Sequence, residues 1–196
     1  TSPDGRTLVF SALGKLWKKE LPDGKPKRVT TQNTDFEFEP AFAPNGKLLT
    51  YVSWNDSSYG QVHILDLISG ETTALTQEKG IYRTPSFNNA GTHIVYRKEP
   101  RNTDQGLAFG KTPGIYTIAA RGGEAKLVTQ EGEYPQFTVD DKRIFLQTGG
   151  TYFGSLTKKL ISVNLEGDDK RTHVQSKYAN RLVPSPDNKW IAYTNL

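Results

Sequence analysis

The stretch SPDGRTLVFS, residues 2–11, decides the fold. Proline presets its own φ, aspartate bonds to nearby backbone, and glycine supplies a positive φ, so Pro3-Asp4-Gly5 predicts a tight turn. The residues after the turn are rich in β-branched and aromatic side chains, which favour a strand. The stretch therefore predicts a turn that leads directly into a β-strand.

The same pattern returns four more times along the chain. The copies read APNGKLLTYVS (43–53), NNAGTHIVY (88–96), TVDDKRIFL (138–146) and SPDNKWIAY (185–193). Their turn positions, Gly5, Gly46, Gly91, Asp141 and Asn188, are 41, 45, 50 and 47 residues apart. Aspartate and asparagine fit the glycine position because they tolerate the left-handed region better than other side chains. Intervals of about 40–50 residues are typical of propeller repeats.

Each complete repeat predicts four short antiparallel strands. The first strand precedes the turn and the second follows it, and a large side chain five residues after the turn position should lie on one face of each second strand. These side chains are Phe10, Tyr51, Tyr96, Leu146 and Tyr193. The predicted first strands, 38–42, 83–87 and 134–137, carry Pro40, Pro85 and Pro135. Since proline cannot donate to a strand ladder, we expect each proline at the start of its strand.

Four-stranded units that recur in this way predict an all-β fold, a β-propeller built from four-stranded antiparallel blades. A β-sandwich is the alternative, but it does not require the same strand order in every unit. The predicted blade repeats fill residues 1–196 as one propeller segment, at about 1–31, 37–77, 82–130, 133–176 and 180–196. We expect a partial ring, with three complete blades plus two incomplete terminal ones, from a longer chain. Unpaired terminal strands then predict that the isolated chain can dimerise.

Composition excludes several classes of protein. A hydrophobic fraction of 35% over 196 residues is enough for a core, and no apolar run approaches the roughly 20 residues of a membrane span. The absence of cysteine excludes disulfides and thiolate chemistry. The net charge of +4 comes from basic residues that do not gather in one segment, so we expect no nucleic-acid partner.

No catalytic motif stands out in the sequence. The three histidines, His63, His93 and His173, lack the spacing of zinc ligands and read as packed or solvated strand residues. The nucleophile pattern Gly-x-Ser-x-Gly and phosphate-binding loops are also missing. The sequence therefore predicts no catalytic residue, no metal site and no cofactor in this segment.

A binding face is the remaining candidate site. The predicted loops after the second strands, 54–60, 98–113 and 149–158, are long and aromatic, and loops of that length are often functional. Aromatic residues and arginine are also enriched at interfaces. The candidate residues are Glu39, Trp54, Tyr59, Arg83, Phe109, Glu133, Tyr134, Tyr152 and Arg181.

Two further expectations concern this face. The charged residues among the candidates precede the predicted inner strands, where they could ring the mouth of the central pore. The aromatic rings could instead pack beneath their own loops.

The repeats resemble those of TolB-like propellers, with their Pro-x-aromatic-Ser-Pro-Asp-Gly pattern, apolar strand and Leu-Thr close, over the whole chain. Residues 11–17 and 36–56 are similar to the N-terminal propeller of bacterial amidohydrolase-family proteins. That second resemblance implies a parent that is a metal-dependent C–N hydrolase with its metal ligands in another domain. Propellers of prolyl-oligopeptidase-type peptidases have similar repeats.

The function expected from these resemblances is a non-catalytic propeller segment that docks on, and gates or recognises ligands for, an adjoining hydrolase domain. Its partner would be that domain of the same chain or another protein. The alternatives are a free-standing TolB-like interaction module in the bacterial envelope and the propeller of a prolyl-oligopeptidase-type peptidase. We expect a periplasmic or secreted location.

Overall fold

The computed structural model describes residues 1–100, 111–150 and 157–195, and those residues form five antiparallel sheets without a helix. The first sheet contains β1 (Thr7–Ala12), β2 (Lys15–Glu20) and β3 (Lys27–Arg28). The second contains β4 (Phe36–Phe42), β5 (Leu48–Asn55), β6 (Tyr59–Asp66) and β7 (Thr72–Ala74). The third contains β8 (Tyr82–Phe87), β9 (His93–Lys98), β10 (Gly114–Ala119) and β11 (Lys126–Thr129). The fourth contains β12 (Glu133–Phe137), β13 (Arg143–Gly149), β14 (Lys158–Asn164) and β15 (Arg171–Ser176), and the fifth contains β16 (Ala179–Pro184) and β17 (Ile191–Asn195).

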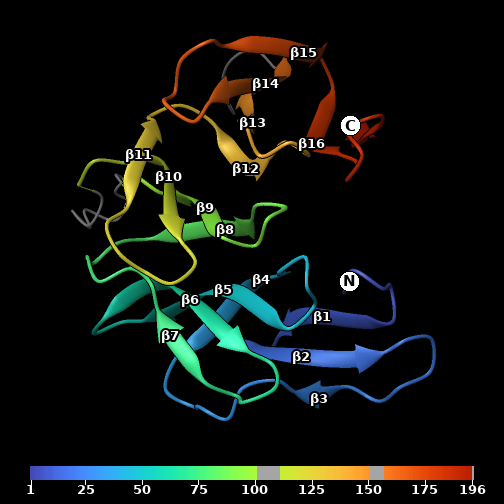
Figure 1. Ribbon diagram of the computed structural model, residues 1–196, viewed down its shortest axis with the longest axis vertical. Coiled ribbons are helices and arrows are strands. Elements are labelled where there is room, and N and C mark those ends of the chain that lie inside the picture. Colours follow the sequence, from blue (N-terminus) through green and yellow to red (C-terminus); the bar gives the residue numbers. More distant parts are fainter. Residues whose placement is uncertain (101–110, 151–156, 196) are drawn as a thin grey trace.

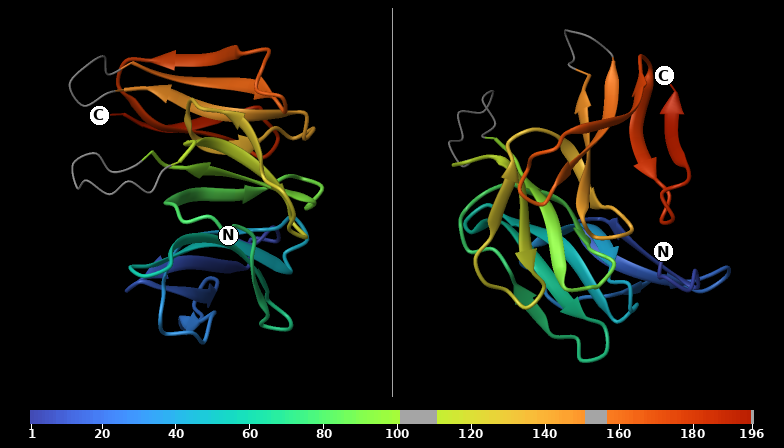
Figure 2. Two further views of the ribbon diagram at one scale, coloured as in Figure 1. Left: turned by 90° about the vertical axis from the view of Figure 1, so that its left-hand side faces the viewer. Right: turned by 45° about the horizontal axis from the view of Figure 1, so that its top comes forward.

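The sheets follow one another around a common centre as an open fan (Figure 1). Strand order in every sheet is chain order, and among the first strands of the three four-stranded sheets, β8 contacts both β4 and β12. Figure 2 shows the first and last sheets at the two ends of the fan. The predicted all-β propeller with an unclosed ring is confirmed.

Four hydrophobic cores lie between successive sheets. Because side chains alternate along a strand, one strand serves two cores. On β5, Leu49 and Tyr51 join the core against the first sheet, whereas Val52 joins the core against the third. On β13, Leu146 joins the core against the third sheet, whereas Phe145 joins the core against the fifth. Each middle sheet is thus buried on both faces, as the radial arrangement requires.

The predicted large side chain of the second strand is buried in the three four-stranded sheets. Tyr51, Tyr96 and Leu146 are 3%, 2% and 0% exposed. Tyr193 is an exception, with 56% of its surface exposed. It lies on β17, whose sheet has two strands and packs against the fourth sheet alone among the described residues.

The predicted turns form at all five positions. The φ angles of Gly5, Gly46, Gly91, Asp141 and Asn188 lie between 57° and 73°. In the first turn the N–H of Gly5 donates to the carbonyl of Ser2 at 2.9 Å, and the other four turns make the same bond at 2.9–3.0 Å.

Asp141 also joins two blades. Its carboxylate accepts hydrogen bonds from the N–H groups of Asn89 and Ala90, at 2.7 and 2.9 Å, and from the side-chain amide of Asn88 at 3.0 Å. These three donors belong to the turn of the third sheet, whereas Asp141 belongs to the turn of the fourth. The aspartate therefore keeps the left-handed turn and adds a contact that glycine could not make.

The inner strands differ from the sequence prediction. Pro40, Pro85 and Pro135 lie within β4, β8 and β12 instead of at their starts. The ladder shifts register at each proline, and the preceding residue has a positive φ of 53° at Glu39, 48° at Thr84 and 51° at Tyr134. The prediction was wrong because a β-bulge leaves one residue unpaired, so that a proline inside the strand breaks no ladder bond.

The first and last sheets each have an open edge. Among the described residues, β1 pairs with β2 and with no second strand, and β17 pairs with β16 alone. The dimer expected from these edges stays a prediction.

Within the described part of the chain, no helix is long and apolar enough to cross a membrane.

A buried histidine lies between the first two sheets. His63 on β6 stacks on Tyr51 with ring centroids 5.0 Å apart, and its Nε2 lies 2.8 Å from the Ser53 hydroxyl. Burial lowers the pKa of His63, and the nearby Asp35 and Glu37 carboxylates oppose that shift in part. His93, by contrast, is exposed.

The His63 pKa predicts how stability depends on pH. Because the folded-state pKa lies below the unfolded value of about 6.5, unfolding takes up a proton below that pH. The contribution of neutral His63 is complete above pH 6.5 and is lost as the pH falls toward the folded pKa. The free energy of unfolding, measured with urea at pH 7.5, 6.5 and 5.5, should therefore fall less with decreasing pH for His63→Phe than for wild type. Equal declines in the two proteins would refute this assignment.

Removal of the Asp141 carboxylate should weaken the contact between blades. We expect Asp141→Gly to lower the free energy of unfolding by about 1–2 kcal/mol, because three donors lose a charged acceptor while the positive φ is kept. Asn188→Gly is the matched control, and relief of backbone strain there should leave stability within about 0.5 kcal/mol of wild type. Denaturant titration measures both, and equal effects of the two changes would contradict the inter-blade role.

Candidate functional site

A cavity of about 440 Å³ opens between the second and third sheets near their inner strands. Its walls come from β4, β5 and β8, with contributions from β1 and β6. The lining residues are Ser11, Phe38, Glu39, Val52, Ser53, Trp54, Gly60, Ile81, Tyr82 and Arg83. We call this cavity the Trp54 pocket.

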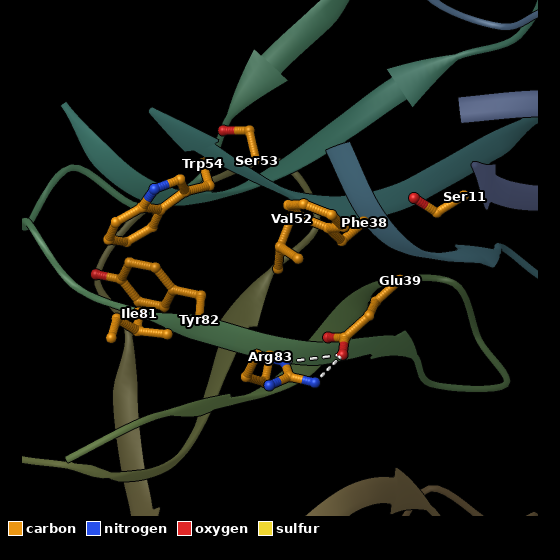
Figure 3. Close-up of a pocket in the computed structure, with 10 residues that line it drawn as sticks. Ser11, Phe38, Glu39, Val52, Ser53, Trp54, Ile81, Tyr82 and Arg83 are labelled. Atoms are coloured by element: carbon orange, nitrogen blue, oxygen red, sulfur yellow. Dashed lines mark hydrogen bonds and ion pairs between the residues drawn. The ribbon is translucent and has the colours of Figure 1, made fainter. Parts of the chain in front are cut away.

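One end of the Trp54 pocket is apolar and aromatic. Figure 3 shows Trp54 and Tyr82 facing each other from the two sheets, with Phe38 and Val52 beside them. Trp54 contacts Tyr59 edge-on with ring centroids 5.7 Å apart, and the Lys79 ammonium lies 4.9 Å from the Tyr59 ring centre. Burial raises the pKa of Tyr82 to about 12, and its hydroxyl donates to the carbonyl of Glu78 at 2.6 Å.

The other end of the pocket carries an ion pair. Arg83 Nε and Nη2 lie 2.8 and 2.6 Å from Glu39 Oε1 (Figure 3). The N–H of Thr84 donates to Glu39 Oε2 at 2.5 Å. The hydrogen bond that Arg83 donates to the Glu39 carboxylate raises the pKa of Arg83, against the effect of burial. Glu39 has a left-handed φ because it lies at the bulge of β4. Such a bulge changes the direction in which a side chain points.

Further charged residues lie beside this ion pair, on the third and fourth sheets. Arg83 and Arg97 lie directly opposite each other in the ladder, an arrangement that is unfavourable without counter-charges. Arg97 lies 3.0 Å from Glu99 and 2.8 Å from Glu133. Burial raises the pKa of Glu99, and the Arg97 guanidinium opposes that shift in part.

A cation–π contact extends the row to the last sheet. The Arg181 guanidinium lies 5.4 Å from the centre of the Tyr134 ring. Both residues have the positive φ of the inner-strand bulge, at 53° and 51°. We call Glu39, Arg83, Arg97, Glu99, Glu133 and Arg181 the inner charge row.

The structure brings the predicted residues together in part. Glu39, Trp54 and Arg83 line one pocket, and Tyr59 contacts Trp54. Glu133 and Arg181 belong to the inner charge row but do not line that pocket, and Tyr134 contacts Arg181. Phe109 and Tyr152 lie outside the described residues.

Two predicted positions need correction. Trp54 and Tyr59 do not lie in a long loop, because β5 extends to Asn55 and β6 begins at Tyr59. The charged candidates Glu39, Arg83, Glu133 and Arg181 lie within the inner strands rather than before them. Arg83 and Glu133 pair with residues of the neighbouring strand, whereas Glu39 and Arg181 lie at the bulges, where the ladder shifts register.

Several site residues were missed by sequence reasoning. Arg97 and Glu99 lie at the end of a second strand, where charged residues usually face solvent, so their sequence carries no distinguishing signal. The sequence places Phe38 at the start of a predicted first strand and gives no signal that singles out Tyr82. Their alternation with the neighbouring strand could have placed them beside Trp54 once the bulge was known.

Comparison with known proteins supports the fold. No family model matches the chain. It is 29% identical over 100 residues to the Tol-Pal system protein TolB of Francisella tularensis, a match that covers 50% of this chain and 23% of that protein. The chain therefore spans less than a quarter of the length of the curated relatives it matches.

Solved structures with the same fold include proteins named as TolB. A putative TolB from Agrobacterium tumefaciens superposes with a TM-score of 0.73 at 18% identity, over 100% of this chain and 73% of that one. Oligogalacturonate lyase in complex with manganese superposes with a TM-score of 0.72 at 14% identity, over 95% of this chain and 55% of that one. The chain has a TolB-like β-propeller fold, and at these identities the structural matches concern the fold alone.

The Glu39–Arg83 pair should add little to stability. Half of the Arg83 side chain is exposed, and exposed ion pairs contribute about 0–1 kcal/mol. We expect a double-mutant cycle of Glu39→Gln and Arg83→Gln to give a coupling energy below about 1 kcal/mol in denaturant titrations. A coupling of several kcal/mol would instead make the pair a structural element of the fold.

Proposed function

We propose that the chain is a non-catalytic recognition module that binds a protein partner through the Trp54 pocket and the adjoining ion pair. The partner would present an apolar or aromatic side chain to Trp54, Phe38 and Tyr82, and polar groups to Glu39 and Arg83. The sequence similarity to TolB, a protein of the Tol-Pal system by its name, supports a protein-binding role.

One observation carries the proposal. The pocket combines an aromatic wall with an ion pair whose arginine is half exposed, which is the composition of protein-interface hot spots. Its volume of about 440 Å³ suits a side chain or a short peptide segment. Phe36 and Leu13, 52% and 92% exposed, add apolar surface close by, since Phe36 lies against Gly14 and stacks on Phe38.

The fold supplies rigidity to this site. Phe38, Trp54 and Tyr82 lie on three paired strands from two sheets that share a buried core. A preformed site loses little conformational entropy when a partner binds. Recognition without large rearrangement is therefore the mode that we propose.

A second candidate function is control of access to an adjoining hydrolase domain. Its support is the resemblance of residues 11–17 and 36–56 to propellers that precede an amidohydrolase domain. These segments include Ser11, Phe38 and Trp54 of the pocket wall. In that case the partner surface would belong to the same polypeptide, and the same pocket would face it. For either role we propose a periplasmic or secreted location in bacteria.

Photo-crosslinking tests the proposed partner surface. A photoreactive phenylalanine at position 54 of the full chain, expressed in the cell of origin, should give one dominant crosslinked protein or an intramolecular crosslink to an adjoining domain. The same group at Thr73, exposed on the outer strand β7, is the control and should give no such product. Equal products from both positions would refute the site.

Affinity measurements with the crosslinked partner give a second readout. We expect Trp54→Ala and Arg83→Glu each to weaken binding at least tenfold, because both remove contacts at the centre of the proposed interface. Trp190→Ala is the matched control, since Trp190 is 75% exposed in the turn between β16 and β17 and far along the chain from the pocket. Its affinity should equal that of wild type, and a loss as large as that of Trp54→Ala would contradict the proposal.

A further inference from the structure

Strand β4 reverses the usual hydrophobic pattern of a half-buried strand. Alternate side chains point to opposite faces, so Phe36 and Phe38 share one face and Glu37 lies on the other. The two phenylalanines are 52% and 39% exposed, whereas Glu37 is fully buried. Solvation favours the opposite arrangement, because burial of apolar surface is favourable and burial of a charge is costly. A shift of register by one residue would exchange the two faces, so specific contacts must hold the observed register.

The Glu37 carboxylate has three hydrogen-bond donors, all from the first sheet or from the link that follows it. Its Oε2 accepts from the N–H of Leu16 at 3.1 Å and from the Thr30 hydroxyl at 2.6 Å. Its Oε1 accepts from the side-chain amide of Gln32 at 2.5 Å. A buried carboxylate is tolerated where such partners satisfy it. All three bonds are lost if Glu37 turns outward, and they therefore oppose the register shift.

The Glu37 backbone adds two contacts with the first sheet. Its N–H donates to the carbonyl of Gly14 at 2.9 Å, and its carbonyl accepts from the Ser11 hydroxyl at 2.6 Å. Among the described residues, the first sheet has three strands and no inner strand beside β1. Glu37 therefore joins this incomplete sheet to the second one through both its side chain and its backbone.

Two cations bind the backbone of the same link. Lys15 Nζ donates to the carbonyls of Gln32 and Asp35, at 3.4 and 2.7 Å, and Arg28 Nη2 donates to the carbonyl of Gln32 at 2.9 Å. None of the ion pairs in the described part of the chain includes Glu37. The positive charges near the link favour the buried carboxylate, whereas its hydrogen bonds fix where it points.

The other described inner strands have no carboxylate at this position. Counted from the bulge residue, Glu37 corresponds to Tyr82 in the third sheet, Gly132 in the fourth and Ala179 in the fifth. The buried carboxylate is therefore a feature of one junction between sheets and not of the repeat. A departure of this kind from the local rules is expected at functional sites.

The reversed pattern supplies apolar surface to the Trp54 pocket. Phe38 lines the pocket, and Phe36 stacks on Phe38 with ring centroids 6.3 Å apart. Ser11, whose hydroxyl bonds to the Glu37 carbonyl, lines the pocket as well. Glu37 does not line it, so it acts on a partner only through the side chains that it holds.

We propose that Glu37 is a positioning residue of the partner-binding surface. Its buried carboxylate fixes the register of β4, and that register keeps Phe36 and Phe38 exposed beside the pocket for apolar contact with a partner. The inference rests on the proposed function for its purpose, but the effect of Glu37 on the two rings can be measured without a partner.

Fluorine NMR of the chain labelled with 4-fluorophenylalanine tests this effect, because a soluble nitroxide broadens the signals of exposed rings. Glu37→Gln keeps the size of the side chain but turns one acceptor atom into a donor. We expect the signals of Phe36 and Phe38 to shift or split, and their broadening to fall at least twofold as the rings turn inward. Unchanged signals and broadening in a folded Glu37→Gln would overturn the proposal.

Asp141→Asn is the matched control for this measurement. The Asp141 carboxylate likewise accepts three hydrogen bonds across a junction, but between the third and fourth sheets. Its substitution should leave the signals of Phe36 and Phe38 as in wild type. Equal changes from the two variants would indicate general loosening of the propeller and would overturn the specific role of Glu37.

Thr30→Val decides the question if Glu37→Gln does not fold. It keeps the shape of a side chain that is 7% exposed and removes one donor to Glu37 Oε2. We expect a smaller change of the same direction at Phe36 and Phe38. The absence of any change at both rings would count against the proposal.

Affinity for the crosslinked partner connects the register to binding. Glu37→Gln should weaken binding at least fivefold, and Asp141→Asn should bind as wild type does. Equal affinities of wild type and Glu37→Gln would overturn the positioning role if Trp54→Ala weakens binding. If Trp54→Ala has no effect either, the proposed function fails, and the ring measurement still decides whether Glu37 holds the register.

Discussion

Each four-stranded sheet buries both of its faces, and this double burial determines how the sheets are arranged. A sheet with apolar residues on both faces needs two covering layers, and here each layer is another copy of the same unit. Leu49 and Tyr51 on one face of β5, and Val52 on the other, show how a single strand contributes to two cores. Repetition of that arrangement turns the sheets about a common centre and brings their first strands together.

The convergence of inner strands positions the candidate site. Their bulges place Glu39, Tyr134 and Arg181 in the left-handed region, and non-glycine residues in that region are costly unless the surrounding structure holds them. As a result, charged residues of both signs lie on neighbouring strands, next to the aromatic wall of the Trp54 pocket. The site therefore results from the propeller geometry itself, with residues from several repeats that are about 45 positions apart in the chain.

The repeat could be predicted from the sequence because its turns obey local rules. The left-handed φ angles at Gly5, Asp141 and Asn188 follow from residue type alone, and so do the strands that the turns connect. The position of Pro40 could not be predicted in this way, because a bulge depends on the partner strand. Arg97 and Glu99 were missed for a related reason, since their role depends on Glu133 and Arg83 across two sheets.

We propose that the partner binds at the Trp54 pocket and along the adjoining inner strands. Hydrogen–deuterium exchange of the chain with and without its crosslinked partner measures which backbone amides the partner covers. Protection on binding should be confined to residues 36–39, 52–60 and 81–84, which form the pocket and its rim. Protection of the outer strands β7, β11 and β15, with no change at the pocket, would show that the partner binds elsewhere.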